Sequence, residues 1–412
     1  MVVGGGAIGI SCAHFLRRSG FDITVIERQR IGRGCSYANC GLIVPSHSQP
    51  VPGPGVIREG VAYLARRDSP FAIRLRPGLA PWLLSFWRAC APDAYRRGSE
   101  HLVALSRAGL ELFDELARDG LAEFGFHRGP LLHAYFSPAG LAQSSAELEE
   151  LATLGIRART LSRDDLLALE PALNPRVLGG TAIEDQAWAD PFAFIRGLAE
   201  QLRRGGTRIV EETEVRRVVT QDERATGVET SDGRIEADLI VLTAGAWTPS
   251  LAAPLGLRLP IQPAAGYSCT IEAPSDGPRL PIVLPERRVV LTPLGDRLRF
   301  GGTLELAGFR SSLDQARYGA VVRAGLDALS AEVPRTAEEP WFGFRPLTAD
   351  GLPAIGWAPE IRGVMIAAGH GMLGFTQAPI TGALVADLAT GHPPSLSLDP
   401  FRPDRFSRRA RS

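Results

Sequence analysis

Three glycines near the amino terminus have the spacing of a phosphate-binding turn. Gly4, Gly6 and Gly9 follow a short apolar stretch, and Glu27 closes the next one. In this pattern the first glycine makes a tight turn, the second lets the backbone approach a pyrophosphate, and the third lets a helix pack closely on a strand. A carboxylate at Glu27 can accept both ribose hydroxyl protons and disfavours a 2′-phosphate, so the ligand is FAD or NAD rather than NADP. We expect the cofactor to contact Gly4, Gly6, Ala7, Ile8, Gly9, Glu27 and Arg28.

A second group of residues lies near the other end of the chain. Residues 343–346 carry Arg345, and residues 369–376 form a glycine-rich run before an expected helix at 376–390. A helix start directed at a flavin stabilises negative charge on the reduced ring, and a guanidinium beside it can hold a substrate carboxylate with two hydrogen bonds. A structural salt bridge is the alternative for Arg345. The expected cofactor contacts here are His370, Gly371, Met372, Leu373, Gly374, Phe375 and Thr376.

A third glycine-rich loop, at 32–43, follows the second apolar stretch. Its hydroxyl and glycine residues fit a second phosphate and the edge of a flavin. Because NAD enzymes seldom need such a segment, it favours FAD. The residues expected to contact the cofactor are Gly34, Ser36, Asn39, Gly41 and Leu42.

Alternating strands and helices are expected to position these groups. Residues 1–3 and 21–27 are expected strands around a helix at 7–20, which gives a β-turn-α-β unit. The short first strand favours a few further residues before Met1. Asp190 and Pro191 have the residue types of a helix cap and a first helical position. A buried strand at 239–247 ends in a small-residue turn that permits close approach to a ligand.

Residues 49–185 and 259–339 break this α/β rhythm. They contain expected helices at 81–87, 101–120, 139–155 and 313–329, with short strands at 131–136, 267–272, 289–293 and 297–301. We therefore predict an α/β fold with a Rossmann-like FAD-binding domain (1–48, 186–258 and 340–412). An α+β substrate-binding domain with a mixed or antiparallel sheet (49–185 and 259–339) is inserted into it.

The composition excludes several classes of function. The 412 residues carry no net charge, which gives no broad field for nucleic acid. The chain has no lysine, which excludes pyridoxal-phosphate and class I aldolase chemistry. Five cysteines, an odd number, favour reduced thiols in the cytoplasm. Cys35 and Cys40 have no second ligand pair, so no metal site is expected.

Membrane contact is expected to be peripheral at most. No apolar run reaches the roughly 18 to 20 residues of a membrane span. The arginines between Arg405 and Arg411 are expected to form a solvated tail, with contact to the anionic inner face of the cell membrane as the alternative. The apolar stretch 81–87 is expected to be a helix that packs in the core or between lobes, with contact to a membrane surface or a partner as the alternative.

Together these segments resemble the D-amino-acid oxidase superfamily of FAD proteins, and within it bacterial D-amino-acid dehydrogenases. The motifs that carry the resemblance are Gly4 to Gly9 with Glu27, 36–41, 266–268, 343–346 with Asp350-Gly351, and 369–376. The resemblance covers nearly the whole chain. It implies that Arg345 clamps the substrate carboxylate and that the Met372 carbonyl accepts the substrate amine. It also implies adenine contact at Val215 and ribityl contact at Thr243, Ala244 and Gly245, with Trp247 as a further cofactor contact. A carboxylate contact is implied at Tyr267, for which plain packing is the alternative.

The chain also departs from its relatives. His47 stands where related dehydrogenases often carry a tyrosine; it either lines the substrate pocket, which would favour a cyclic imino acid, or is a surface or structural residue. No cysteine lies near Trp341 to Arg345 or His370 in the sequence, so we expect non-covalent FAD. Oxidase relatives use a lysine to activate oxygen, and its absence favours a dehydrogenase.

The implied reaction is oxidative deamination of a D-amino acid, with a hydride passing from Cα to flavin N5. The imino acid product hydrolyses to a 2-oxo acid and ammonia, and electrons leave to a quinone or another acceptor. Three alternatives remain: dehydrogenation of D-proline, hydroxyproline or an N-methyl amino acid, an NAD-dependent dehydrogenase, and a flavoprotein subunit that is inactive alone.

Overall fold

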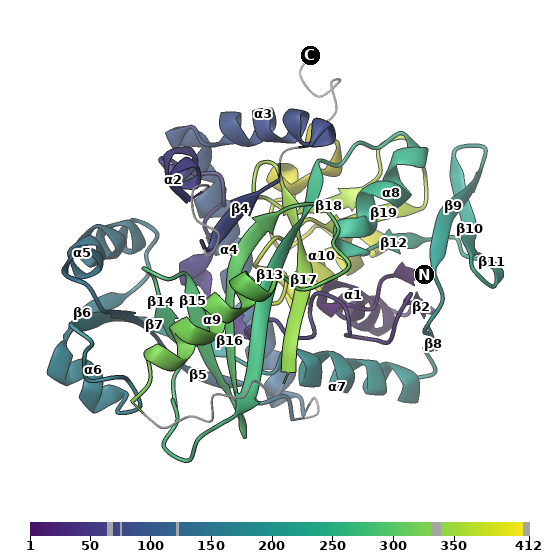
Figure 1. Ribbon diagram of the computed structural model, residues 1–412. Helices are drawn as coiled ribbons and strands as arrows, with labels where there is room; N and C mark the ends of the chain where they lie inside the picture. The colour runs from purple at the N-terminus through teal and green to yellow at the C-terminus, as the bar shows by residue number, and fades with distance from the viewer. Residues whose placement is uncertain (64–68, 75, 121–122, 331–338, 407–412) are drawn as a thin grey trace.

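The computed structural model describes residues 1–63, 69–74, 76–120, 123–330 and 339–406. In this part of the chain, six strands form a sheet in the order β18-β19-β12-β1-β2-β8 (Figure 1). All neighbours are parallel except β18 and β19. The strands are β18 (Ala354–Trp357), β19 (Val364–Ala368), β12 (Ile240–Leu242), β1 (Val2–Val3), β2 (Thr24–Ile26) and β8 (Arg208–Val210). Because β12 lies between β1 and β19, the two ends of the chain share one sheet.

Helices cover one face of this sheet. α1 (Ala7–Arg18), α4 (Pro92–Arg118), α7 (Pro191–Arg204) and α10 (Ala378–Thr390) share one apolar core with the inner strands. The Asp190 carboxylate caps α7 by accepting from the backbone N–H groups of Phe192 and Ala193, as expected for its start. On the other face a second core joins the sheet to β9 (Val215–Gln221), β10 (Arg224–Thr230), β11 (Gly233–Glu236) and α8 (Thr248–Ala252).

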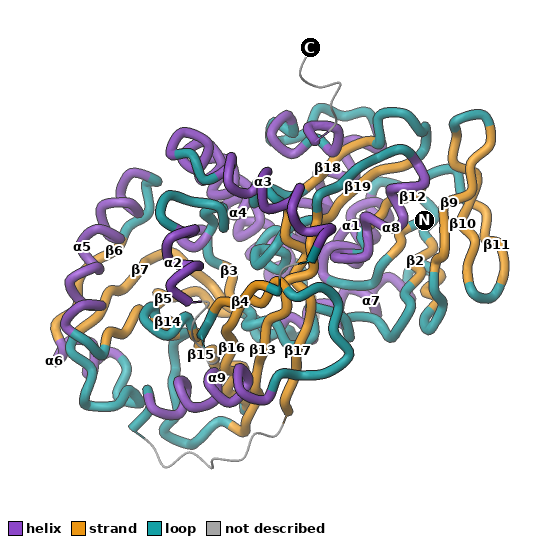
Figure 2. Tube along the Cα trace, turned by 45° about the horizontal axis from the view of Figure 1, so that its top comes forward, coloured by secondary structure: helices purple, strands orange, loops and turns teal. Residues whose placement is uncertain are grey.

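A larger sheet lies beside the first (Figure 2). In the described residues its order is β17-β13-β16-β15-β14-β5-β7-β3, with β4 paired to β16 and β6 paired to β7. It is mostly antiparallel, and α9 (Gln315–Asp327) packs on one face. The strands are β3 (Leu42–Ile43), β4 (Phe71–Ile73), β5 (His127–Tyr135), β6 (Ala158–Ser162), β7 (Gly179–Trp188), β13 (Ile261–Glu272), β14 (Ile282–Leu284), β15 (Val289–Leu294), β16 (Arg297–Leu306) and β17 (Glu339–Thr348).

The predicted fold class, α/β with a mixed second sheet, is confirmed. The helix expected at 101–120 begins earlier, at Pro92, whose ring suits a first helical turn. The sequence did not predict β7, β14 or α6 (Arg163–Leu169). β3 and β17 pair within the larger sheet, although the expected boundaries assign their residues almost entirely to the FAD-binding part. The division into two domains stays a prediction.

Three helices lie on the outside of the larger sheet: α2 (Val56–Tyr63), α3 (Ala80–Ala89) and α5 (Pro138–Thr153). α3 buries Trp82 and Phe86 against the protein, while Leu84 and Trp87 are 48% and 60% exposed. The stretch 81–87 therefore packs on the protein along one side only. Within the described residues, we find no helix with the length and apolar character needed to cross a bilayer.

Candidate active site

A cavity of about 1530 Å³ extends between the two sheets. Single small-molecule pockets usually measure roughly 300–1,000 Å³, so this one has room for a dinucleotide together with a substrate. The residues proposed for catalysis all line it: Arg345, Tyr267, Met372 and His47. So do the predicted cofactor residues Gly4, Gly6, Ala7, Ile8, Glu27, Arg28, Gly34, Ser36, Asn39, Leu42, Val215, Thr243, Ala244, Gly245, Trp247, His370, Gly371, Leu373, Gly374, Phe375 and Thr376.

Gly9 and Gly41 are the two predicted cofactor residues that do not line the cavity. A Cβ on Gly9 would lie 1.8 Å from the backbone oxygen of Gly4, so this glycine lets α1 pack on the turn. Gly41 has φ +73°, and a Cβ there would lie 2.1 Å from the backbone oxygen of Ala189. Their contribution is to the shape of the turns and not to direct contact.

The glycine turn leaves open space where a pyrophosphate would lie. Gly4 has φ +114°, and a Cβ there would meet the Thr243 backbone oxygen at 2.7 Å, so the protein itself requires this glycine. At Gly6 a Cβ would meet only the Ser36 hydroxyl, at 3.3 Å. The cleared space above Gly6, at the start of α1, fits a dinucleotide phosphate.

Glu27 stands at the end of β2, on the cavity wall. One carboxylate oxygen accepts from the backbone N–H of Gly5 at 2.7 Å, and the other accepts from that of Gln29 at 2.9 Å. A carboxylate oxygen has two acceptor sites, so both remain able to accept a ribose hydroxyl proton. The Arg28 guanidinium lies 3.6 Å from the centre of the Trp247 ring and lines the same region.

The loop at 34–42 is braced from inside the protein. The Ser36 hydroxyl accepts from the backbone N–H of Ala7 at 3.1 Å, which leaves its proton for a phosphate oxygen. The Asn39 side-chain oxygen accepts from the backbone N–H of Gly41 at 2.8 Å, and its backbone oxygen accepts from Arg299 at 2.7 Å. Asn39 therefore shapes the loop with its carbonyl groups.

The carboxy-terminal glycine run is joined to both other segments. The backbone N–H of Gly371 donates to the Pro346 oxygen at 2.9 Å, and the Thr376 hydroxyl donates to the Leu42 oxygen at 3.1 Å. The His370 ring lies 3.0 Å from the Thr381 hydroxyl, and burial lowers the pKa of His370 to about 3, so the ring is neutral. Phe375 lines the cavity but also packs into an aromatic core beside Phe113 and Phe194.

Arg345 projects from β17 across a gap left by a glycine. Ala264 of β13 pairs with Arg345, and Gly266 pairs with Gly343, so all four lie on one face of the sheet. A Cβ on Gly266 would lie 2.1 Å from a guanidinium nitrogen of Arg345. The same nitrogen donates to the backbone oxygen of Thr303 at 2.6 Å. The remaining N–H groups of the half-buried guanidinium can hold a carboxylate.

The geometry does not favour the expected carboxylate contact at Tyr267. Tyr267 follows Gly266 on β13, so its side chain points to the opposite face of the sheet from Arg345. Its hydroxyl donates to the Glu305 carboxylate at 2.6 Å, and the residue is 1% exposed. Strand alternation, which a family motif does not reveal, separates the two side chains.

His47 lies on the cavity wall, in the short helix η1 (Pro45–His47), away from the protein surface. Its ring packs edge-to-face on His133, with centroids 5.1 Å apart, and one nitrogen lies 3.1 Å from the Ser46 hydroxyl. His133 in turn pairs with Glu147 at 3.0 Å. Burial, together with the neighbouring His133, lowers the pKa of His47 to about 3. A neutral imidazole therefore faces the cavity.

Two cysteines lie close to Arg345 in the fold, although none is close in the sequence. Cys35 and Cys40 line the cavity, and the sulfur of Cys40 occupies the space that a Cβ on Gly301 would need. Burial raises the pKa of Cys35 to about 11 and also raises that of Cys40, against the opposing effect of Arg345. Both thiols are protonated at neutral pH, and non-covalent cofactor binding stays a prediction.

Comparison with known proteins identifies the family. The model of the FAD dependent oxidoreductase family matches residues 1–388. The chain belongs to this family. The cavity, with its cleared turn at Gly6 and its acidic side chain at Glu27, fits FAD, and the cofactor prediction is confirmed. As in any FAD-dependent oxidoreductase, the partners are a small-molecule substrate and an electron acceptor.

Curated relatives in the family match over the full length of the chain. A D-amino acid dehydrogenase of Bradyrhizobium diazoefficiens is 32% identical over 99% of this chain and 99% of its own. A D-amino acid dehydrogenase of Cereibacter sphaeroides is 34% identical over 100% of this chain and 97% of its own. The predicted resemblance is therefore confirmed.

Solved structures of similar length share the fold. Glycine oxidase from Geobacillus kaustophilus superposes with a TM-score of 0.75, at 23% identity, over 98% of this chain and 97% of its own. L-proline dehydrogenase from P. horikoshii superposes with a TM-score of 0.76, at 20% identity, over 99% and 97%. At these identities the likeness concerns the fold alone.

Several cavity residues carried no signal in the sequence. Thr303, His133 and Glu147 line the cavity but belong to none of the sequence motifs described above. Thr303 reaches Arg345 only because β16 pairs with β13, and His133 meets His47 only because β5 crosses the same wall. Such residues can be identified as cavity residues only once the strand register is known.

Proposed function

We propose that this oxidoreductase is a D-amino-acid dehydrogenase that converts a D-amino acid into an imino acid, which water hydrolyses to a 2-oxo acid and ammonia. The observation that carries the proposal is the Arg345 guanidinium, which projects into the FAD cavity through the gap at Gly266. Two full-length relatives named D-amino acid dehydrogenase support the choice of substrate class.

In this proposal Arg345 fixes the substrate by its carboxylate. A planar guanidinium holds a carboxylate with two parallel hydrogen bonds and restricts both its position and its rotation. Thr303 already accepts from one nitrogen of Arg345, which limits the directions in which the remaining N–H groups can point. The amino acid is thereby oriented with Cα toward the segment that begins at Gly371.

The amine end of the substrate is assigned to the backbone carbonyl of Met372. This role does not depend on the side chain, which is 48% exposed. Bound FAD supplies the acceptor for the hydride that leaves Cα. The pKa values of His47 and His370 are lowered to about 3, so neither imidazole changes its protonation near neutral pH. We therefore expect activity to rise with pH as the substrate's own ammonium group loses its proton.

A panel of amino acids tests this proposal. The purified yellow protein is mixed anaerobically with D- and L-amino acids, and the visible absorption band of the flavin is followed. We expect bleaching by D-isomers only, and a rate that rises with pH as the amine deprotonates. Bleaching by L-isomers, or a rate independent of pH between mildly acidic and alkaline conditions, would contradict the proposal.

The same panel decides the alternatives. D-proline, hydroxyproline and N-methyl amino acids test the secondary-amine reading, which His47 on the cavity wall favours. A protein that binds flavin yet is bleached by none of these compounds would be a subunit that needs partners. Turnover with an artificial acceptor, and not with oxygen, is the result expected of a dehydrogenase.

The acceptor is proposed to be a quinone or another carrier, reached from the cytoplasmic side by peripheral contact with the membrane. Leu84 and Trp87 on the outer side of α3 offer an apolar contact. Arg405 is less suited to this role than its sequence suggested, because it pairs with Asp350 at 2.9 Å. The expected basic cluster at 407–411 lies outside the described residues. Sedimentation with anionic vesicles, lost in Trp87→Ser, tests the contact; equal sedimentation of both proteins would contradict it.

A further inference from the structure

The strand that holds Arg345 in place carries a strained residue. Thr303 on β16 has φ +66°, a left-handed conformation that a β-branched residue rarely adopts. The register between β13 and β16 shifts at the same point, between Ala265 and Tyr267, which marks a β-bulge. The bulge turns the Thr303 backbone oxygen toward Arg345, whose nitrogen donates to it at 2.6 Å.

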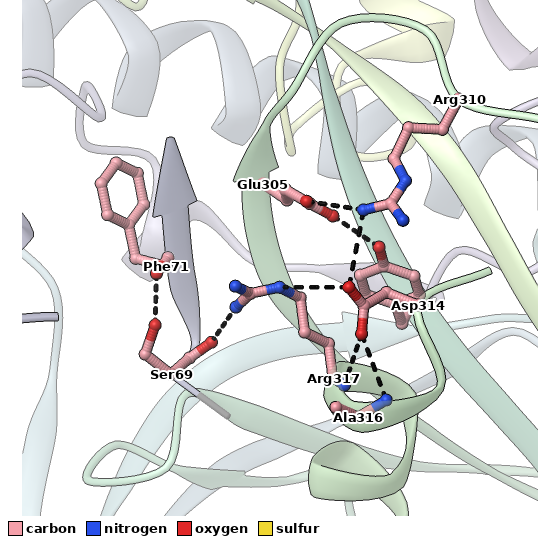
Figure 3. Close-up of polar contacts among 8 residues, drawn as sticks. Ser69, Phe71, Glu305, Arg310, Asp314, Ala316 and Arg317 are labelled. Atoms are coloured by element: carbon pink, nitrogen blue, oxygen red, sulfur yellow. Dashed lines mark hydrogen bonds and ion pairs between the residues drawn. The ribbon is translucent and has the colours of Figure 1, made fainter. Parts of the chain in front are cut away.

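A polar network around Glu305 begins two residues after Thr303 on β16 (Figure 3). Glu305 on β16 is 2% exposed. Its carboxylate accepts from the Tyr267 hydroxyl at 2.6 Å and from Arg310 at 2.7 Å. Glu305 follows the bulge on β16, and Tyr267 follows it on β13, so their hydrogen bond ties the two strands together at the point where the register shifts.

The outer part of the network balances the charge of Glu305. Asp314 caps α9 and lies 3.6 Å from Arg310 and 3.9 Å from Arg317. Arg317 donates to the backbone oxygen of Ser69 at 2.8 Å, just before β4 (Figure 3). Two carboxylates and two guanidinium groups thus compensate one another, as a buried charge requires.

We propose that Glu305 is a positioning residue for the substrate carboxylate: with Tyr267 and Arg310 it holds the bulge at Thr303, and the bulge holds Arg345 in its binding orientation. Tyr267 thereby serves the carboxylate without touching it. The inference rests on the proposed function, since it assigns Glu305 to the anchor of that same site. A purely structural glutamate would lower stability without any effect specific to the carboxylate.

Two conservative variants test the positioning role. Glu305→Gln removes the charge that holds Arg310, and Tyr267→Phe removes the hydroxyl while keeping the ring. We expect each to lower kcat/KM for a D-amino acid by about tenfold, the size of one net hydrogen bond, mainly through KM. Flavin content is expected to stay at the level of the natural protein. Unchanged kcat/KM in both variants would overturn the proposal.

Combination with Arg345→Met separates positioning from general damage. If Glu305 acts through Arg345, Glu305→Gln has no further effect on kcat/KM once Arg345 is gone. A tenfold loss that persists in the Arg345→Met background would overturn the proposal. Glu170→Gln is the matched control, because Glu170 is also a buried glutamate, 1% exposed. It lies away from the cavity, where it accepts hydrogen bonds from the backbone N–H groups of Arg279 and Leu280. This variant is expected to change stability and leave kcat/KM unaltered.

Binding of benzoate provides a readout that needs no turnover. The change in the flavin's visible spectrum on titration gives its dissociation constant, which we expect to rise about tenfold in Glu305→Gln and in Tyr267→Phe. If no D-amino acid bleaches the flavin but benzoate binds in this pattern, the proposed function fails and the positioning role stands. Equal benzoate affinity in all the proteins would overturn the positioning role alone.

Discussion

The two walls of the cavity use their glycines in different ways. On the wall formed by the parallel sheet, Gly4 and Gly9 make room for backbone atoms of the same β-turn-α-β unit and its neighbouring strand. On the wall formed by the larger sheet, Gly266 and Gly301 make room for the side chains of Arg345 and Cys40, which come from distant parts of the chain. The first wall is shaped by local backbone geometry, and the second by side chains brought together through strand pairing.

On the larger-sheet wall, removal of the Arg345 guanidinium is expected to lower activity more than any other change. Arg345→Met should cost about 2–5 kcal/mol of transition-state binding, because a substrate carboxylate loses its charged partner. That corresponds to a loss of roughly 30-fold to several thousand-fold in kcat/KM. Steady-state kinetics with an artificial electron acceptor measures it. The bound flavin should be unaffected, and near-normal kcat/KM would remove Arg345 from the site.

A methyl group on Gly9 is expected to disrupt the packing of α1 behind the parallel-sheet wall. Gly9→Ala places a Cβ 1.8 Å from the Gly4 backbone oxygen, so α1 and the turn must move apart, at a cost of about 1–3 kcal/mol. We expect a lower Tm and loss of most FAD on purification. Gly78→Ala is the control, because a Cβ at Gly78 meets nothing within 4 Å. Equal flavin content in the two variants would contradict this account of the turn.

A smaller effect is expected at the phosphate loop of the same wall. Ser36→Ala removes the hydroxyl that accepts from the Ala7 N–H and whose proton is left for a phosphate oxygen. We expect the lost hydrogen bond to cost about 1 kcal/mol of FAD affinity, which corresponds to roughly a fivefold rise in the FAD dissociation constant. Equilibrium dialysis of the FAD-depleted protein measures this change. Ser85→Ala on α3 removes an exposed hydroxyl bonded to Pro81 and serves as the control. Equal FAD affinity in the Ser36 and Ser85 variants would exclude a phosphate role for Ser36.

Acid should lower the stability of the folded protein through the two neutral histidines of the cavity. His370 and His47 have folded-state pKa values of about 3, against an ordinary value near 6.5. The unfolded chain therefore binds more protons between these values, so the stability they contribute is complete above about pH 6.5 and is lost as the pH falls toward 3. We expect Tm to fall over this range, with a shallower slope in His370→Gln. An unchanged slope would show that His370 does not titrate on unfolding.

This difference between the walls also explains what the sequence could predict. The turn at Gly4, the carboxylate at Glu27 and the cap at Asp190 are local patterns whose physics is contained in a few consecutive residues, and the structure has each element where it was expected. The family motif at 369–376 placed the second glycine run on the same cavity. Element ends were less predictable, because α4 begins at Pro92, before the regular apolar spacing that predicted a start at residue 101.

The larger-sheet wall was less predictable because it depends on register. Tyr267 was expected either to contact the substrate carboxylate or to pack in the protein, and strand alternation on β13 favours packing because its side chain and that of Arg345 lie on opposite faces of the sheet. Thr303 has no motif, and its strained backbone is a consequence of the bulge opposite Tyr267. Cys35 and Cys40 are distant from Arg345 in the sequence and close to it in the fold. These contacts arise between segments that are far apart along the chain.

The most direct test of the central claim compares two substrates on two proteins. The natural chain and Arg345→Met are each mixed anaerobically with a D-amino acid and with the amine that lacks its carboxylate, and the rate of flavin bleaching is measured. The account predicts that the natural chain strongly prefers the amino acid and that Arg345→Met loses most of this preference. If both proteins prefer the amino acid equally, the carboxylate is bound elsewhere and Arg345 is a structural residue.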